Sequence, residues 1–328
     1  MDPFPSLAEI EAAQRRLAPY VRTTPCTTLG PQELNGDRQF DSHLIFKLEL
    51  LQLTGTFKAR GALNVMLHLT PAQLAAGVTA VSAGNHAIAV AYAARVLGAS
   101  ARIVMLKTAN PARVQLAKEY GAVVEMAADG PSAFRRVHQI EEEEGRYFVH
   151  PFEGPLTVTG AATLGAEFQQ QAAHLDAVVV AVGGGGLIAG VAAAVKQLSP
   201  GTRVFGVEPR GADSMSRSFA AGQPVTLPAV ATIADSLAPP MATPYTFGVC
   251  RRFVDRLVTI DDAEMRRTMG TIFADLKLAV EPAGAAALAA ALGPLRPDLG
   301  GGQRVGIVVC GSNIDLQTFC RYASTDVR

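Results

Sequence analysis

The lysine at position 58 lies in a turn rich in glycine and threonine, between an apolar segment and a helix-forming one. Its surroundings read Thr54-Gly55-Thr56-Phe57-Lys58-Ala59-Arg60-Gly61-Ala62. An amine held in such a turn could form a Schiff base with an aldehyde once burial or neighbouring charges lower its pKa. A surface lysine at the start of a helix would show the same local pattern, so other parts of the chain must decide between the two.

Four consecutive glycines, Gly183-Gly184-Gly185-Gly186, follow an apolar run at 177–182 and precede an alanine-rich segment. The pattern indicates a strand, a tight turn and a helix. Glycines let backbone N–H groups approach an anion, and the N-terminus of a helix adds favourable partial charge, so a phosphate is the expected ligand. A turn without a ligand would not need four glycines in a row, which are conformationally costly.

The same segment also fits the dinucleotide-binding fingerprint. Gly184, Gly186 and Ala189 have the G-x-G-x-x-A spacing, and Glu208 ends the next expected strand at about the place of a ribose-binding acid. The motif lies past the middle of the chain, however, and four glycines exceed what the fingerprint needs. A nicotinamide-dependent oxidoreductase is therefore one rival hypothesis, and a catalytically silent binding protein is another.

Short apolar runs alternate with helix-forming segments along most of the chain. Strands are expected at 44–49, 78–81, 101–105, 123–126, 177–182, 204–208 and 305–309. Helices are expected from the capping box at Ser6 to Leu17, over 58–69, 86–97 and 110–120, after Ser132 and up to Leu198. This alternation predicts an α/β fold of mostly parallel sheets covered by helices on both faces.

The composition is typical of a globular enzyme, since 49% of the 328 residues are hydrophobic. The 29 acidic and 29 basic residues balance, which predicts no nucleic-acid or anionic-membrane partner. Met1–Pro5 lacks a signal-peptide pattern, and no stretch resembles a membrane span. Cys26, Cys250, Cys310 and Cys320 are widely spaced, which indicates reduced thiols and a cytoplasmic location.

Three further motifs accompany the lysine turn and the glycine cluster. They are Ser82-Ala83-Gly84-Asn85-His86, Glu281-Pro282-Ala283-Gly284-Ala285 and Cys310-Gly311-Ser312-Asn313-Ile314-Asp315. Together and in this order, the five motifs resemble the fold-type II pyridoxal-phosphate enzymes, in particular the serine/threonine dehydratase and serine racemase branch. The resemblance implies a homodimer with a tryptophan synthase β-like fold. It also implies a small substrate-binding domain at 76–148 and a large cofactor-binding domain from 1–75 and 149–328.

The resemblance assigns cofactor-binding roles to residues of these motifs. Lys58 would hold pyridoxal 5′-phosphate and remove the Cα proton of the substrate. Asn85 would bond the phenolic oxygen of the cofactor, and Cys310 would lie beside its pyridine nitrogen as a neutral thiol or pack as a small hydrophobe. The remaining cofactor-binding positions would be Phe57, Gly183, Gly184, Gly185, Gly186, Leu187 and Glu281. Phe57 could equally be a core residue.

The turn at 82–86 would receive the substrate carboxylate at the start of a helix. The residues implied are Ser82, Ala83, Gly84, Asn85 and His86, although His86 could also be an ordinary cap residue. Racemase-like members carry a proton-transferring residue at the position of Ala83, and alanine has no proton to give. We therefore expect elimination from the L-enantiomer without racemisation.

Many relatives bind a cation near the segment that matches 208–214. Glu208 and the Ala212 carbonyl fit the family pattern, but Ser214 replaces an acidic ligand. Because a divalent ion loses more than a monovalent one when a carboxylate is missing, the expectation is a weakened site for K⁺ or Na⁺, or an empty loop.

The predicted function is dehydration of an L-β-hydroxy-α-amino acid to a 2-oxo acid and ammonia. Threonine, serine and phenylserine are the candidate substrates, and a hydroxyaspartate dehydratase or an amino-acid racemase of the same family is the alternative. Gly130-Pro131 lies where hydroxyaspartate-preferring relatives tend to offer an arginine, which favours a neutral side chain on the substrate. The family's Gly-Gln-Gly-Thr segment is Gly160-Ala161-Ala162-Thr163 here, and its effect on the pocket does not follow from the sequence.

Overall fold

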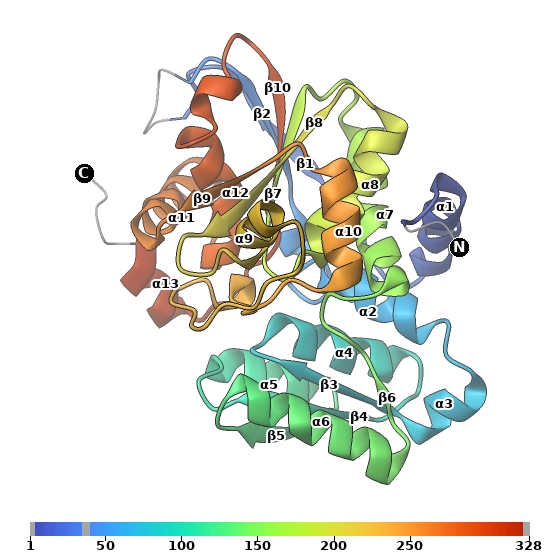
Figure 1. Cartoon of the computed structure of the whole chain (residues 1–328). Coiled ribbons are helices and arrows are strands. Elements are labelled where there is room, and N and C mark those ends of the chain that lie inside the picture. The colour runs from blue at the N-terminus through green and yellow to red at the C-terminus, as the bar shows by residue number, and fades with distance from the viewer. Residues whose placement is uncertain (1–3, 35–39, 324–328) are drawn as a thin grey trace.

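The computed structural model describes residues 4–34 and 40–323, and within these ranges the chain forms two sheets (Figure 1). The large sheet has six strands in the order β1-β2-β10-β7-β8-β9, with β1 antiparallel to β2 and the other neighbours parallel. The small sheet has four parallel strands in the order β5-β4-β3-β6. The predicted α/β fold of mostly parallel sheets is confirmed.

The strands are β1 (Cys26–Leu29), β2 (His43–Lys47), β3 (Val78–Ser82), β4 (Ala101–Leu106), β5 (Val123–Ala127), β6 (Tyr147–Phe148), β7 (Ala177–Ala181), β8 (Arg203–Pro209), β9 (Arg256–Ile260) and β10 (Arg304–Val308). The helices are α1 (Leu7–Leu17), α2 (Lys58–Met66), α3 (Pro71–Ala76), α4 (Asn85–Val96), α5 (Pro111–Glu119), α6 (Gly130–Glu144), α7 (Pro155–Gln171), α8 (Gly186–Leu198), α9 (Ser214–Ala221), α10 (Pro244–Phe253), α11 (Asp262–Leu276), α12 (Pro282–Leu292) and α13 (Leu316–Ala323). Short 3₁₀ helices lie at Glu49–Leu51, Asp235–Leu237 and Arg296–Asp298.

Local signals in the sequence explain where several elements begin. Ser6 caps α1 and forms the predicted capping box with Glu9. Two predicted helix bounds are wrong. The helix α2 ends at Met66 instead of continuing to 69, and Thr70 then caps the separate helix α3. The helix α6 begins before Ser132, because the Asp129 side chain accepts a hydrogen bond from the Ser132 N–H and so caps the helix.

Helices cover both faces of each sheet. On the large sheet α8, flanked by α7 and α10, covers one face, and α12 with α11 and α13 behind it covers the other (Figure 1). On the small sheet α4 and α5 lie opposite α6. Burial on both faces explains why β7 is apolar throughout, with the sequence Ala-Val-Val-Val-Ala.

The small sheet is built from residues within 78–148, inside the span predicted for a smaller domain. The domain bounds themselves stay a prediction. Among the described residues, no helix has both the length and the apolar character that crossing a membrane requires. Residues 1–3, part of the segment that lacks a signal-peptide pattern, lie outside the described residues.

The topology brings distant motifs to one place. In parallel sheets the carboxyl ends of the strands share an edge, and ligands bind where the strand order reverses. The strands β7 and β10 are neighbours although they are far apart in sequence, so the glycine cluster after β7 lies near Cys310 after β10. The helix α2 packs against α4 of the small sheet and α7 of the large one, which puts Lys58 at the junction (Figure 1).

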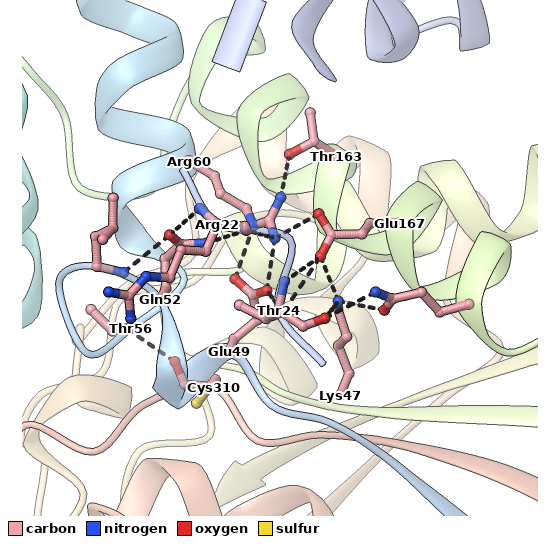
Figure 2. A network of polar contacts seen from close by, with 12 residues as sticks. Arg22, Thr24, Lys47, Glu49, Gln52, Thr56, Arg60, Thr163, Glu167 and Cys310 are labelled. Carbon is pink, nitrogen blue, oxygen red and sulfur yellow. Dashed lines mark hydrogen bonds and ion pairs between the residues drawn. The ribbon is translucent and has the colours of Figure 1, made fainter. Parts of the chain in front are cut away.

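A buried ion network holds α2 in position (Figure 2). Arg60 is 1% exposed, and its Nε and Nη2 donate to the two carboxylate oxygens of Glu49 at 2.9 and 2.8 Å. Nη2 also donates to Glu167 at 2.9 Å, and Lys47 Nζ lies 2.5 Å from the other oxygen of Glu167. Burial alone would raise the pKa of Glu49, but the Arg60 guanidinium, with smaller contributions from Thr24 and Lys47, outweighs burial and holds this pKa below its ordinary value.

The sequence did not show how the segment 160–163 affects the pocket. In the structure this segment packs against α2. A Cβ atom on Gly160 would lie 2.5 Å from the Arg60 carbonyl oxygen, so glycine allows α7 to approach α2 closely. The Thr163 hydroxyl accepts a hydrogen bond from Arg60 Nη1 at 3.3 Å and donates one to the Gly160 carbonyl at 2.7 Å. The segment therefore contributes to the position of Lys58 through Arg60.

We expect Arg60→Met to lower the free energy of unfolding by about 3–5 kcal/mol, because it leaves the Glu49 carboxylate buried without its main partner. Urea unfolding of the purified protein would measure this loss. Arg256→Met is the matched control: it removes an ion pair with Asp298 in which both side chains are partly exposed, and it should cost less than about 1 kcal/mol. Equal losses in the two variants would contradict the importance of the buried network.

Candidate active site

A cleft of about 450 Å³ lies between the two sheets, and several of the predicted site residues line it. Lys58, the turn at 82–86 and Gly184 all line it. A smaller adjoining cavity of about 30 Å³ shares some of the same lining residues. The structure thereby brings the predicted cofactor-binding positions together around this second cavity: Phe57, Lys58, Asn85, Gly183, Gly184, Gly185, Gly186, Leu187, Glu281 and Cys310.

The amine of Lys58 points into this region and not into bulk solvent. Its Nζ donates a hydrogen bond to the Pro151 carbonyl at 2.5 Å and lies 5.2 Å from the centre of the Phe57 ring. Burial lowers the pKa of Lys58 to about 8, so more of the amine is neutral near neutral pH than in an ordinary lysine. A neutral amine can act as a nucleophile or a base. The surface-lysine alternative is contradicted by the position of Lys58 in the walls of both cavities.

The turn before Lys58 is tied to the segment after β10. The Phe57 N–H and the Thr56 hydroxyl both donate to the Cys310 carbonyl, at 3.2 and 3.0 Å. The thiol of Cys310 donates to the Ala283 carbonyl at 3.4 Å, and burial raises the pKa of this thiol above its ordinary value. Cys310 is therefore a neutral group in the cavity wall, and its backbone fixes the start of α2.

The glycine cluster forms a tight turn that leads into α8. Gly185 has a φ of +89°, a conformation that favours glycine, and a Cβ atom on Gly184 would lie 2.3 Å from the Phe152 ring. The Thr246 hydroxyl donates to the Gly184 carbonyl at 3.1 Å and holds the turn from outside. The first N–H groups of the 13-residue helix α8 have no partner within the helix, and Gly185, Gly186 and Leu187 line the cavity, so the turn could hold a phosphate.

A hydrogen-bond network fixes the side chain of Asn85. Its Nδ2 donates to Glu281 at 2.6 Å and to the Ser236 hydroxyl at 3.1 Å, while its Oδ1 accepts from Asn313 Nδ2 at 2.8 Å. Glu281 is fully buried. Burial raises the pKa of Glu281, although Arg113 Nη2, 3.0 Å from its second oxygen, opposes this rise. The amide of Asn85 thus presents a defined orientation to the cavity.

Arg113 is a site residue that the sequence analysis missed. It lies on α5 of the small sheet, is 4% exposed, and also binds Asp235 at 2.6 Å and the Asn313 carbonyl at 2.6 Å. One guanidinium therefore joins the small sheet to three groups of the large one. Sequence signals for it were weak, because arginines are mostly exposed in folded proteins. Asn313 belonged to the motif at 310–315, but nothing in that motif indicated its contact with Arg113.

The turn at 82–86 connects β3 to α4. Gly84 caps the helix, and a Cβ atom there would lie 2.2 Å from Arg113 Cδ. The Ser82 hydroxyl accepts the Gly84 N–H at 2.9 Å. His86 Nε2 pairs with the Val149 carbonyl at 2.7 Å, and burial lowers the pKa of His86 to about 3. The His86 ring is therefore neutral and engaged, and an anion at this turn would be bound by the N–H groups at the start of α4.

The candidate cation site is organised around a helix cap. The Glu208 carboxylate accepts the Met215 N–H at 2.8 Å, the Ser216 N–H at 2.7 Å and the Ser216 hydroxyl at 2.5 Å, all at the start of α9. Burial raises the pKa of Glu208 to about 7. The Ser214 hydroxyl is buried and has no hydrogen-bond partner among the described residues. The described residues contain no cluster of three metal-binding His, Cys, Asp or Glu side chains, so a monovalent site that includes the Ala212 carbonyl stays a prediction.

The position of Glu208 also bears on the oxidoreductase hypothesis. Its side chain is 0% exposed and its two oxygens are used by α9, so it cannot hydrogen-bond a ribose. The glycine spacing of the dinucleotide fingerprint is present, but its acidic residue is engaged elsewhere. Glu208 therefore cannot be the ribose-binding acid that the oxidoreductase hypothesis requires.

Comparison with known proteins agrees with this geometry. The model of the family described as "Pyridoxal-phosphate dependent enzyme" matches residues 17–311. The chain is 53% identical to a phenylserine dehydratase from Ralstonia pickettii, over 97% of this chain and 96% of the relative. Its structure is similar to that of maize serine racemase, with a TM-score of 0.89, 36% identity and 96% of each chain covered. It is also similar to the structure of a threonine deaminase from T.th., with a TM-score of 0.88, 40% identity and coverage of 95% and 99%. This chain therefore belongs to the pyridoxal-phosphate dependent enzymes.

Proposed function

We propose that this chain is a lyase that removes water from an L-β-hydroxy-α-amino acid and yields a 2-oxo acid and ammonia. The observation that carries the proposal is the meeting of the Lys58 amine, the glycine turn of α8 and the start of α4 around one cleft. The phenylserine dehydratase and threonine deaminase relatives support the reaction class.

Each part of the cleft has a role in this proposal. When bound, pyridoxal phosphate supplies an electron sink for the pair released at Cα. The N–H groups at the start of α8 bind its phosphate, and the start of α4 binds the substrate carboxylate. Lys58 holds the cofactor and, with a pKa of about 8, can accept the Cα proton. The neutral thiol of Cys310 leaves the pyridine ring a weaker electron sink, which favours prompt loss of the β-hydroxyl.

The substrate side chain would lie in the apolar arm of the cleft. Its walls come from Leu106, Gly130 and Phe134 on the small-sheet side and from Val230, Pro240 and Met241 on the other. Apart from Lys58, no lysine or arginine of the described chain lines the cleft, so a second substrate carboxylate would find no cation. The arm therefore favours a bulky apolar β-substituent such as phenyl over the carboxylate of hydroxyaspartate.

The racemase alternative requires proton transfer on both faces of Cα. Ala83 lines the cleft and carries no group that could transfer a proton. Lys58 is left to serve one face, which favours elimination. The homodimer and the cytoplasmic location that the resemblance implies are further proposals; sedimentation of the purified holoenzyme would test the first.

Lys58→Ala should abolish release of 2-oxo acid from L-threo-phenylserine and leave the overall fold intact. Borohydride should fix the cofactor to the peptide that carries position 58 in the wild-type holoenzyme and not in the variant, as mass spectrometry would detect. Lys118→Ala, which alters a lysine on α5 outside the cleft, is the control. Fixation of the cofactor at another lysine, or no 2-oxo acid from the wild type, would refute the proposed function.

Gly130→Leu should lower kcat/KM for L-threo-phenylserine relative to L-serine by about 10-fold or more, the usual effect of losing space for apolar groups. A Cβ atom on Gly130 meets no atom within 4 Å, so the new side chain would enter open space in the arm. Taking the ratio of the two substrates removes any general effect on folding. Gly201→Leu also enters open space but lies outside the cleft, and should leave the ratio unchanged. An unchanged ratio in Gly130→Leu would place the β-substituent elsewhere.

The wild-type enzyme should not interconvert L- and D-serine, because one face of Cα lacks an acid. Chiral chromatography of serine during turnover would test this. Ala83→Ser should introduce slow interconversion by restoring a hydroxyl at that face. Racemisation by the wild type at a rate comparable with elimination would show that another group serves the second face.

A further inference from the structure

His150 is a cleft residue to which the proposed function gives no role. It follows β6 in the segment that leads back to the large sheet, and its ring lines the cleft. Its Nδ1 accepts the backbone N–H groups of Phe152 and Glu153, at 3.3 and 2.9 Å. A nitrogen that accepts two N–H groups carries no proton, so the ring proton is on Nε2.

The environment also keeps this imidazole neutral. Burial lowers the pKa of His150 to about 4, and the nearby Lys58 contributes to the lowering while Glu153 opposes it. The rings of Phe148 and Phe152 contact the imidazole edge-on, with centres 5.5 and 4.7 Å away. The side chain is therefore a rigid single donor near neutral pH. In the described part of the chain, no group accepts a hydrogen bond from Nε2.

His150 and the amine of Lys58 are held by the same short segment. The carbonyl of Pro151, the next residue, accepts the hydrogen bond from Lys58 Nζ at 2.5 Å. Two other titratable side chains of the cleft are already engaged: Asp235 pairs with Arg113, and the His86 ring pairs with a backbone carbonyl. An N–H donor that has no partner in the described chain thus belongs to the residue next to Pro151, whose carbonyl binds the amine proposed to remove the Cα proton.

We propose that the Nε2–H of His150 donates a hydrogen bond to the β-hydroxyl oxygen of the substrate and stabilises the negative charge that develops there. This inference rests on the proposed function. The Cα–H electron pair forms the Cα–Cβ double bond, and the Cβ–O pair leaves with the oxygen. The proton that Lys58 took from Cα then moves to that oxygen and completes a water molecule. His150 keeps its own proton and acts as a fixed dipole where charge builds up.

Two substrates that differ only in the leaving group separate this role from a structural one. L-Serine loses hydroxide, which needs stabilisation, whereas β-chloro-L-alanine loses chloride, which is already a stable anion. His150→Asn keeps a side-chain oxygen for the N–H groups of Phe152 and Glu153 but removes the donor at the Nε2 position. It should lower kcat/KM for serine by about 10²-fold, the effect of losing one such donor, and leave kcat/KM for β-chloroalanine nearly unchanged.

His150→Gln restores an N–H near the Nε2 position and should recover much of the serine activity. His138→Asn removes an imidazole from the exposed face of α6 and should leave both substrates unaffected. Equal losses on serine and β-chloroalanine in His150→Asn, or no loss on serine, would overturn the inference. Failure of the wild type to eliminate from either substrate would instead refute the proposed function, so the two failures are distinguishable.

Discussion

The buried guanidinium of Arg60 determines where the amine of Lys58 lies, because both side chains belong to the first turn of α2. Taking four charged groups out of water is costly unless each is paired. Here two cations, Arg60 and Lys47, face two carboxylates, Glu49 and Glu167, so the buried network is neutral as a set. Its members come from β2, the 3₁₀ helix after it, α2 and α7, which ties the start of α2 to the large sheet (Figure 2).

Burial also controls the charge of the cleft itself. It keeps the rings of His86 and His150 and the thiol of Cys310 neutral, and it lowers the pKa of Lys58. The favourable sites for anions are then the N-termini of α4 and α8, where backbone N–H groups lack partners. This arrangement suits a phosphate and a carboxylate bound at opposite walls. Between these two anion sites, the cleft is lined by neutral groups such as His150, which can donate a hydrogen bond, and by Lys58, which can take up a proton.

The two sheets contribute different parts of the reaction chemistry. In the proposed function, the large sheet would supply the lysine and the turn that binds the phosphate, and the small sheet would supply the turn for the carboxylate and part of the apolar arm. Arg113 joins them by binding Asp235 and Glu281 across the cleft. Because Glu281 also holds the amide of Asn85, the contact between the sheets is continuous with the cavity that we propose binds the cofactor. The orientation of Asn85 therefore depends on the same junction that joins the two sheets.

Much of this protein follows from local patterns in its sequence. Hydrophobic periodicity and caps located seven of the ten described strands and six of the thirteen described helices to within a few residues, because these signals act between residues close in the chain. Long buried helices such as α7 and α12 were not predicted, and the phosphate-binding role of the glycine cluster stays a proposal. The tertiary structure decided the rest. Arg113 and Glu281 are 168 residues apart, as Asn85 and Ser236 are 151 apart, and no local pattern encodes such pairs. The folded chain likewise places Glu208 where it caps α9, and it places the N–H groups that fix the tautomer of His150. Such pairing depends on neighbours that only the folded chain brings together.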